Sequence, residues 1–391
     1  MEIINYLNSV IQKNRLTIDD FFKFKLQNLV PTLYNSVDIR DSGFKVAPVD
    51  TNIFPAGFNN LSDQEIKKTN QEFKNYISTY YPNTKNILLI TENHTRNLFY
   101  LDNVYALTKV FEGFELQISN LLFEKEEILI SNSSHELKYT PIKLKDNFLV
   151  DKNDNKFDLV ILNNDLSSGY NELIKNANNP IIPNPLHGWF NRSKVKHFEA
   201  YYNLVEELSK LININPFFIT TQVKACGYVN FKEKTGLECL TSKAEELLQN
   251  LKIQYKEMKI PYDPYLFIKA DQGTYGMGIM SITSAEEILN LNKDTRKKMA
   301  VIKEGMENTS VIIQEGIPTQ NKYNNNPAEP MSYLIGGKPI SLFLRVNSEQ
   351  DETGNLNSKG MFFINDKFNK DEISVYSLIS QLASLATIFE I

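Results

Sequence analysis

The residues most suggestive of chemistry form a glycine-rich segment, PYLFIKADQGTYGMGIMSIT, at positions 264–283. Its glycines are Gly273, Gly276 and Gly278, and Lys269 lies shortly before them. Glycines let backbone amides approach phosphate oxygens without obstruction by side chains. A lysine flanked by apolar residues is costly to leave unpaired, and phosphate is a natural partner for it. We therefore expect this segment to bind the phosphates of a nucleotide.

The residues after the glycines exclude two common nucleotide-binding motifs. A Walker loop needs Lys and then Ser or Thr directly after its last glycine, and Ile279 and Met280 stand there instead. A dinucleotide-binding fingerprint opens a helix, whereas GIMSIT alternates like a strand, which also disfavours a dehydrogenase. We expect the loop to join two strands as a flap over a nucleotide. A plain hairpin with a glycine-rich turn and a surface lysine is the alternative.

Two further basic residues are candidates for contacts with phosphate. Arg345 lies in an apolar strand, LFLRVN, and is expected to be catalytic together with Lys269 by binding a γ-phosphate or an acyl phosphate. A structural salt bridge is the alternative for Arg345. Lys224, in TTQVKAC, is a second candidate contact with phosphate or adenine, and a surface lysine is its alternative.

Charged residues are also concentrated in segment 30–61, which is too polar for a core and too aromatic for a linker. An amino-acid substrate carries a carboxylate, which suits arginine, and an ammonium group, which suits Asp and Asn. We expect this segment to bind an amino acid through Arg40, Lys45, Asp50 and Asn52. A salt-bridged loop that packs on itself is the alternative.

The cysteines and histidines are not expected to be catalytic. Cys226 and Cys239 form no CxxC pattern and suggest no pairing with histidine, so each is predicted to be a small core residue. The histidines lack the spacing of metal ligands.

The elements that must position these residues alternate between helices and strands in the N-terminal half. Helices are predicted within 1–30, near 62–80 and at about 97–115, and strands at 86–92, 126–131 and 157–165. Thr17 is a candidate cap of the second N-terminal helix. Such alternation is typical of a parallel α/β sheet, in which ligands bind beyond the carboxyl ends of the strands. Asn93, Asn164 and Asp165 are expected to lie at those ends.

The C-terminal half is predicted to contain two helices and then mainly strands. The helices cover 193–212 and 241–257, and the proline-rich segment 178–189 precedes them as a crossover. The later strands are YLFIKA, GIMSIT, SVIIQEGI, MSYLIG and KPISLFLRVN, and a helix follows at about 371–389.

Length and composition place further limits on the protein. A chain of 391 residues suggests two or three domains, and a net charge of −5 argues against non-specific binding of nucleic acid. Two cysteines fit a reducing compartment, and the sequence contains no signal-like start and no apolar run of membrane-spanning length. We therefore expect a cytoplasmic protein that binds no membrane. The sequence leaves open whether the chain forms a homo-oligomer.

The strand, the lysine, the glycine loop and the second strand together resemble the small lobe of the ATP-grasp fold. SVIIQEGI, residues 310–317, resembles its hinge strand, which implies that Gln314, Glu315 and Ile317 hold adenine and ribose. The resemblance implies an α/β fold with an N-terminal parallel α/β domain at 1–200, which includes the substrate-binding segment 30–61, and an ATP-grasp region at 201–391. The small lobe would cover about 216–300 and the large lobe about 301–391.

Longer stretches resemble the ATP-grasp-type glutamate–cysteine ligase family found in some proteobacteria. They are VPTLYNSVDIRDSGFKVAPVDTNIFPAGFNNL, NPLHGWFNRSKVKHF, IKADQGTYGMGIM and AEPMSYLIGGKPISLFLRVN. This resemblance implies ATP- and Mg²⁺-dependent joining of L-glutamate and L-cysteine to γ-glutamylcysteine through an acyl phosphate, the first step of glutathione biosynthesis. Another ATP-grasp amino-acid ligase and a small-molecule kinase on the same fold are the alternatives.

The expected metal site departs from the ATP-grasp pattern. Many enzymes of that fold end with a strand pair that carries Asp and Glu-x-Asn ligands, whereas this sequence ends in ATIFEI after its last helix. The candidate magnesium ligands are therefore Glu329, Glu352, Asn355 and Asn357. A truncated or inactive homologue that only binds a nucleotide is the alternative.

Overall fold

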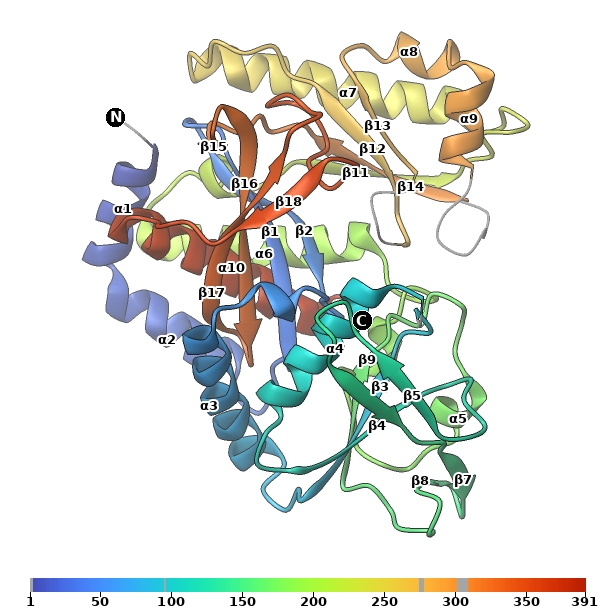
Figure 1. Cartoon of the computed structure of the whole chain (residues 1–391). Coiled ribbons are helices and arrows are strands. Elements are labelled where there is room, and N and C mark those ends of the chain that lie inside the picture. Colours follow the sequence, from blue (N-terminus) through green and yellow to red (C-terminus); the bar gives the residue numbers. More distant parts are fainter. Residues whose placement is uncertain (1–2, 95, 274–277, 301–308) are drawn as a thin grey trace.

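The computed structural model describes residues 3–94, 96–273, 278–300 and 309–391. It is a mixed α/β protein with parallel and antiparallel sheets. Figure 1 shows three layers of strands along the molecule: a small sheet covered by helices, a central sheet, and a largely parallel sheet at the opposite end. The predicted alternation of strands and helices is therefore confirmed for one part of the chain only.

The parallel sheet has the strand order β10-β9-β3-β4-β6-β5. Its strands are β3 (Asn86–Thr91), β4 (Glu115–Asn120), β5 (Glu127–Ile130), β6 (Glu136–Tyr139), β9 (Leu159–Asn163) and β10 (Ile181–Ile182). The strands predicted at 86–92 and 157–165 are its central pair, β3 and β9, and run parallel. The strand predicted at 126–131 is β5, an edge strand that pairs with β6 antiparallel rather than joining the parallel core.

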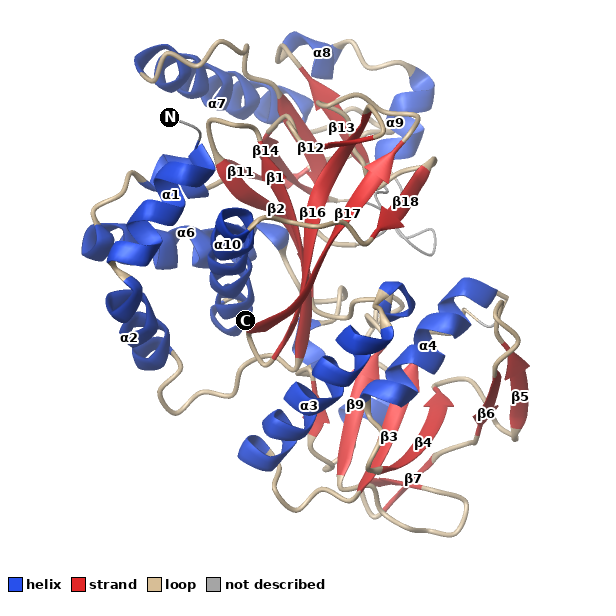
Figure 2. Cartoon of the chain, turned by 60° about the vertical axis from the view of Figure 1, so that its left-hand side comes forward, coloured by secondary structure: helices blue, strands red, loops and turns tan. Residues whose placement is uncertain are grey.

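Two helices cover one face of the parallel sheet, as Figure 2 shows. They are α3 (Asp63–Tyr80) and α4 (Leu98–Val110). Helix α3 begins where predicted because Ser62 and Glu65 form a capping box that satisfies the first amides of the helix. Helix α4 ends at Val110, earlier than expected from the sequence, since a tight turn at Gly113, with φ 108°, brings the chain back into β4.

The central sheet joins segments far apart in the sequence, in the order β18-β17-β16-β1-β2. Its strands are β1 (Tyr34–Asp41), β2 (Val46–Asn52), β16 (Asn326–Ile335), β17 (Lys338–Asn347) and β18 (Met361–Ile364), with the short β15 (Lys322–Tyr323) beside β16. Segment 30–61 was judged too polar for a core, and that interpretation is wrong for β1, because every residue of β1 is buried. Asp38 and Arg40 of β1 are buried against Arg345 and Glu329 from other strands. The pairing of β1 with β16 crosses the predicted boundary at residue 200.

Four helices pack together against the central sheet and share one apolar core. They are α1 (Ile3–Lys13), α2 (Arg15–Lys25), α6 (Lys194–Ile212) and α10 (Lys370–Phe389). Thr17 lies inside α2, whose N-cap is Asn14, so the predicted cap is wrong. Helix α10 is long and apolar enough to span a membrane, yet 61% of that stretch is buried inside the protein. It is a core helix.

The small sheet has the order β11-β14-β12-β13. Its strands are β11 (Val223–Tyr228), β12 (Leu266–Ala270), β13 (Ile279–Ile282) and β14 (Ser310–Glu315). Strands β12 and β13 are antiparallel, with Lys269 opposite Ile279, which confirms that the glycine loop joins two strands. Strand β14, predicted within the large lobe, lies between β11 and β12.

The remaining elements are short or cover the small sheet. Helix α7 (Leu237–Glu257) packs on the small sheet, with α8 (Glu286–Leu289) and α9 (Lys293–Met299) beside β13. The others are α5 (Glu172–Lys175), β7 (Lys143–Lys145), β8 (Phe148–Val150), η1 (Phe58–Asn60), η2 (Pro185–His187) and η3 (Pro216–Ile219).

Candidate functional site

A cavity lies where the small sheet meets the central sheet, and we call it the central cavity. It encloses about 710 Å³, part of it open to solvent. Strands β1, β2, β12, β14, β16 and β17 and the start of α6 contribute to its walls. Its charged lining residues are Asp38, Arg40, Asp50, Lys194, Lys269, Glu315, Glu329 and Arg345. A cavity with this many charged walls suits a charged ligand better than an apolar one.

Lys269 is the basic residue that β12 places in the cavity. Its Nζ donates to the carbonyl of Val49 at 3.3 Å and lies 5.4 Å from the ring centroid of Phe267. Burial lowers the pKa of Lys269 to about 8, although the nearby Asp50 carboxylate opposes the shift. An anion in the cavity would stabilise the charged form of this lysine.

Asp50 and Lys194 form an ion pair across the cavity wall, with Nζ and Oδ1 3.0 Å apart. Burial alone would raise the pKa of Asp50, but Lys194 and Lys269 outweigh it and hold the pKa well below its ordinary value. Lys194 also lies 4.3 Å from the ring centroid of Trp189. The sequence analysis missed Lys194, whose only signal was its place at the start of a helix capped by Ser193.

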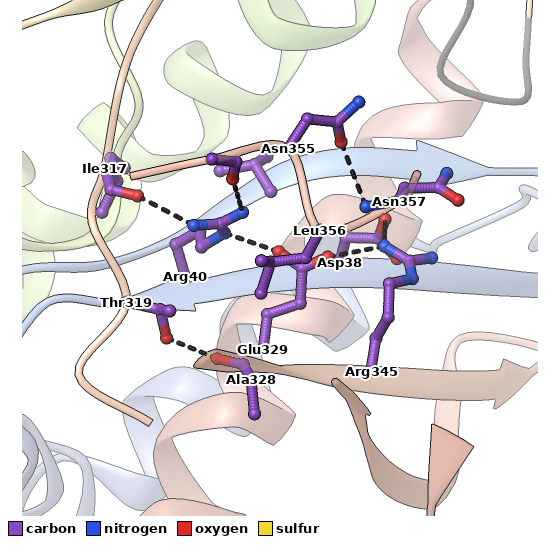
Figure 3. Close-up of polar contacts among 12 residues, drawn as sticks. Asp38, Arg40, Ile317, Thr319, Ala328, Glu329, Arg345, Asn355, Leu356 and Asn357 are labelled. Atoms are coloured by element: carbon purple, nitrogen blue, oxygen red, sulfur yellow. Dashed lines mark hydrogen bonds and ion pairs between the residues drawn. The ribbon is translucent and has the colours of Figure 1, made fainter. Parts of the chain in front are cut away.

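Two arginines and two carboxylates form a buried network beside Lys269, drawn in Figure 3. Glu329 accepts from Arg40 Nε at 2.5 Å through one oxygen and from Arg345 Nη1 at 2.6 Å through the other. Arg345 Nη1 also donates to Asp38 at 2.5 Å. Asp38 was not predicted as a site residue. All of these charges are nearly removed from water, so each depends on its partners.

The pKa values of the two carboxylates in this network shift in opposite directions. Burial raises the pKa of Asp38 to about 6, since Glu329 and Asp50 add repulsion and offset the attraction of Arg345. Burial also acts to raise the pKa of Glu329, but Arg40 and Arg345 together hold it below its usual value. Glu329 is thus the stable anion that fixes both guanidinium groups.

Arg40 also connects the network to two loops. Its Nη1 donates to the carbonyls of Ile317, at 3.4 Å, and Glu352, at 3.2 Å, and its Nη2 donates to the carbonyl of Gly354 at 2.8 Å. Arg40 therefore holds the chain after β14 and the loop that carries Asn355 and Asn357, both of which line the cavity.

Lys45 lies away from the cavity. Its fully buried Nζ is 2.7 Å and 2.8 Å from the two carboxylate oxygens of Glu315 and 3.7 Å from the ring centroid of Phe217. Tyr255 Oη donates to the same carboxylate at 3.0 Å. Burial lowers the pKa of Lys45, and Glu315 opposes that shift. These contacts fit a structural role for Lys45, and they occupy the Glu315 side chain that was expected to hold a nucleoside.

Most of the predicted site residues meet in the central cavity. Its lining includes Arg40, Asp50, Lys269, Gly273, Gln314, Glu315, Ile317, Glu329, Arg345, Asn355 and Asn357. Four predicted residues besides Lys45 are described but not in that lining: Lys224, which pairs with Glu246, Glu352, which is exposed, Asn52 and Gly278. Gly278 has the positive φ of 61° expected of a glycine loop, and Gly276 lies outside the described residues.

The predicted magnesium ligands fit a metal only in part. Both carboxylate oxygens of Glu329 accept from arginines, and Glu352 is exposed and does not line the cavity. Among the residues that the structure describes, no cluster of three or more His, Cys, Asp or Glu side chains could hold a metal ion. The amide oxygens of Asn355 and Asn357 remain as candidates.

A second hollow adjoins the central cavity, and we call it the side chamber. It encloses about 950 Å³, part of it open to solvent, and shares Asp38, Asp50, Arg345 and Asn357 with the central cavity. Asn52 lies in its wall. The carboxyl ends of β3 and β9 contribute Glu92, Asn163 and Asp165, as expected for ligand sites in parallel sheets. The chamber therefore joins the parallel sheet to the network around Glu329.

Comparisons with known proteins agree with this arrangement. A family model described as GshA, glutamate-cysteine ligase, matches residues 8–391. A crystal structure of a protein provisionally named gamma-glutamylcysteine synthetase, from Methylobacillus flagellatus KT, has a TM-score of 0.91 and 34% sequence identity, over 98% of this chain and 95% of that one. A D-alanyl-alanine synthetase A from Vibrio cholerae has 10% identity over 76% of this chain and 80% of that one, and its TM-score of 0.37 is too low to bear on the fold. The search of curated proteins found no significant match.

Proposed function

Because this chain belongs to the glutamate–cysteine ligase family, it is a carbon–nitrogen ligase of glutathione biosynthesis that uses ATP, and we propose that the central cavity is its catalytic centre. One observation carries this proposal: Lys269, Arg345 and the start of the glycine loop line the same cavity. These are the groups that phosphoryl transfer to a carboxylate requires.

The chemistry that we assign to the cavity has two steps. The side-chain carboxylate of glutamate attacks the γ-phosphorus of ATP, and ADP leaves. The amine of cysteine then attacks the carbonyl carbon of the γ-glutamyl phosphate, the new C–N bond forms, and phosphate leaves. Negative charge develops on phosphoryl oxygens in the first step and on the carbonyl oxygen in the second. Lys269, Lys194 and Arg345 would stabilise that charge.

The nucleotide would lie between the small and central sheets. Gln314, Glu315 and Ile317 line the cavity beside β12, and their backbone groups would hold adenine and ribose. The loop with Gly273, Gly276 and Gly278 would cover the phosphates and exclude water, which would otherwise hydrolyse the acyl phosphate.

We include Mg²⁺ in the proposal, at a site where substrate phosphates supply most of its ligands. Mg²⁺ in such enzymes is bound by substrate phosphates and waters with one or two protein oxygens. Asn355 and Asn357 could supply those oxygens, and the ion would neutralise phosphate charge during transfer. Glu329 is assigned a different task, that of orienting Arg40 and Arg345.

We also propose the ATP-grasp fold, in which the small sheet and the central sheet hold the nucleotide between them. The antiparallel β12–β13 hairpin beside β14 supports it. The division into a domain at 1–200 and an ATP-grasp region at 201–391 stays a prediction, and the region would also need β1 and β2 from the N-terminal half. A cytoplasmic location belongs to the same proposal.

The experiment is coupled ADP release by the purified protein with ATP and Mg²⁺, run with glutamate alone, cysteine alone and both. We expect full release only with both amino acids, and γ-glutamylcysteine as the product by mass spectrometry. Sustained release with a single amino acid and a phosphorylated product would instead identify a kinase.

A pair of lysine variants tests the place of the chemistry. Lys269→Met should lower kcat/KM by about 10²–10³ because a charge next to the transferring phosphoryl group is lost. Lys252→Met changes an exposed lysine on α7 and should keep wild-type activity. Equal activity of the two variants would exclude the central cavity as the catalytic centre.

A further inference from the structure

We propose that the side chamber binds the amino acid that supplies the amine, L-cysteine, with its carboxylate at Arg345, its ammonium group at Asp38 and Asp50, and its thiol toward Met331 and Met361. The proposal rests on the function proposed above and assigns a binding site to one of the two amino-acid substrates. Each part of it follows from a separate feature of the chamber.

The first feature is the connection between the chamber and the central cavity. Asp38, Asp50, Arg345 and Asn357 line both spaces, so a ligand in the chamber reaches the groups that surround the phosphates. The chamber is therefore placed to present an amine to an acyl phosphate formed in the central cavity.

The second feature is an unsatisfied donor on Arg345. Its Nη1 and Nη2 atoms donate to Asp38 and Glu329. Its Nε is buried and has no hydrogen-bond partner among the described residues. Arg345 as a whole is only 5% exposed. Buried donors are almost always satisfied, and we assign a ligand carboxylate as the partner of this N–H when the substrate is bound.

The third feature is the charge of the chamber wall. Four carboxylates line it, those of Asp38, Asp50, Glu92 and Asp165, of which Asp38 pairs with Arg345 and Asp50 pairs with Lys194. Such a wall attracts an ammonium group and repels an extra carboxylate. Cysteine is a net-neutral zwitterion, whereas glutamate carries a second carboxylate. Glutamate is better matched by the central cavity, where Lys194 and Lys269 are added.

The fourth feature is an apolar side. Met331, Met361, Phe363, Phe54 and Tyr333 line the chamber together with the carboxylates. The thiol of cysteine is neutral at pH 7 and behaves as a small apolar group that makes favourable contacts with aromatic rings and other sulfur atoms.

Filling the chamber is the direct test. Met361 lies on β18 at the rim and is 43% exposed, so Met361→Trp can fill the space without disturbing the core. We expect the KM for cysteine to rise at least about tenfold, with the KM values for ATP and glutamate unchanged within about threefold. The neighbouring Phe362 points to the opposite face of β18, and Phe362→Trp is the matched control with wild-type constants.

A second variant removes charge without adding volume. Glu92→Gln keeps the oxygen that accepts from the Asp165 amide at 2.8 Å. It should raise the KM for cysteine by about threefold or more, since one attracting charge is lost. Glu199→Gln, an exposed carboxylate on α6, is the control.

The outcomes separate the two proposals. A rise in the KM for glutamate in place of that for cysteine would assign the chamber to glutamate and overturn the inference. Unchanged constants in both chamber variants, with an active wild-type enzyme, would also overturn it. A wild-type protein that fails to ligate the two amino acids would contradict the proposed function itself. Thermal unfolding of each variant shows whether it is folded, and if Met361→Trp does not fold, Glu92→Gln decides.

Discussion

At the level of single residues, several buried charged groups of this protein are paired with charges from distant parts of the chain. Glu329 lies between two guanidinium groups, Lys45 faces Glu315, and Asp50 faces Lys194. Removing one partner of such a pair leaves a buried charge uncompensated, which costs about 3–5 kcal/mol. Lys269 differs because its Nζ contacts a backbone carbonyl and its pKa is already lowered.

Lys269 should make ATP binding depend on pH. Burial lowers its pKa to about 8, and the protonated form is the one that attracts phosphate. Affinity is therefore fully present below pH 8 and is lost as the pH rises through that value, at most about tenfold per pH unit. Lys269→Arg stays charged throughout and should bind ATP with little change from about pH 7 to 10. Calorimetric titration over this range checks both curves, and parallel curves for the two proteins would exclude the role of Lys269.

At the level of elements, the position of Lys194 depends on a second buried cluster at the end of α10. Glu390 lies 2.6 Å from Arg192 Nε and 2.6 Å from His197 Nδ1, and Arg192 Nη1 donates to the carbonyl of Thr51 at 2.7 Å. This cluster joins α10 to the start of α6 and to β2 beside Asp50. A glutamate remote from the cavity thus helps to place both members of the Asp50–Lys194 pair.

Replacing Glu390 by Gln should destabilise the protein by about 3 kcal/mol at pH 7, because Arg192 and His197 lose a buried partner. Burial would raise the pKa of Glu390, but Arg192 and His197 lower it from 4.5 to about 2. Its contribution to stability is present above pH 4.5 and is lost as the pH falls toward 2, so the difference between the variant and the wild type should shrink over that range. Urea unfolding of both proteins at neutral and acidic pH measures this difference in the free energy of unfolding. Glu199→Gln, an exposed residue of α6, is the control, and a pH-independent difference would contradict the ion-pair account.

At the level of the whole molecule, the first and last parts of the chain form one sheet and one core. Strand β1 pairs with β16 from Tyr34 opposite Ile335 to Asp38 opposite Met331. Helices α1 and α6 pack with α10 in the same apolar cluster. The parallel sheet is inserted between these parts in the sequence. The central-sheet side of the central cavity therefore depends on residues that are about 300 positions apart, as Arg40 and Glu329 are.

Cutting the chain at residue 200 tests this dependence. The segment 201–391, expressed alone, loses β1 and β2 from its sheet and α1, α2 and the start of α6 (194–200) from its core, so we expect no cooperative thermal transition. The full chain under the same conditions is the reference. A sharp transition for 201–391 near the Tm of the full chain would support the predicted domain boundary instead.

The sequence by itself determined the structural features and site residues that can be recognised from neighbouring positions in the chain. The glycine-loop hairpin, the central parallel strands and most helix positions follow from periodicity and turn residues, which act within a few positions of the chain. Lys269 and Arg345 could be singled out because a charged residue in an apolar strand is unusual in any context. The family could be identified from segments that together span most of the chain.

Only the tertiary structure decided which charged residues meet. Segment 30–61 has the composition of a loop, and it becomes two buried strands because β16 and β17 bring partners for its charges. Asp38 carries no local signal and Lys194 carries only its place at the start of a helix, and they enter the site through Arg345 and Asp50. Lys45, with the same local appearance as Lys269, is turned toward Glu315 instead. The energy of a buried charge is set by its neighbours in space, and those neighbours lie up to about 300 residues away in this chain.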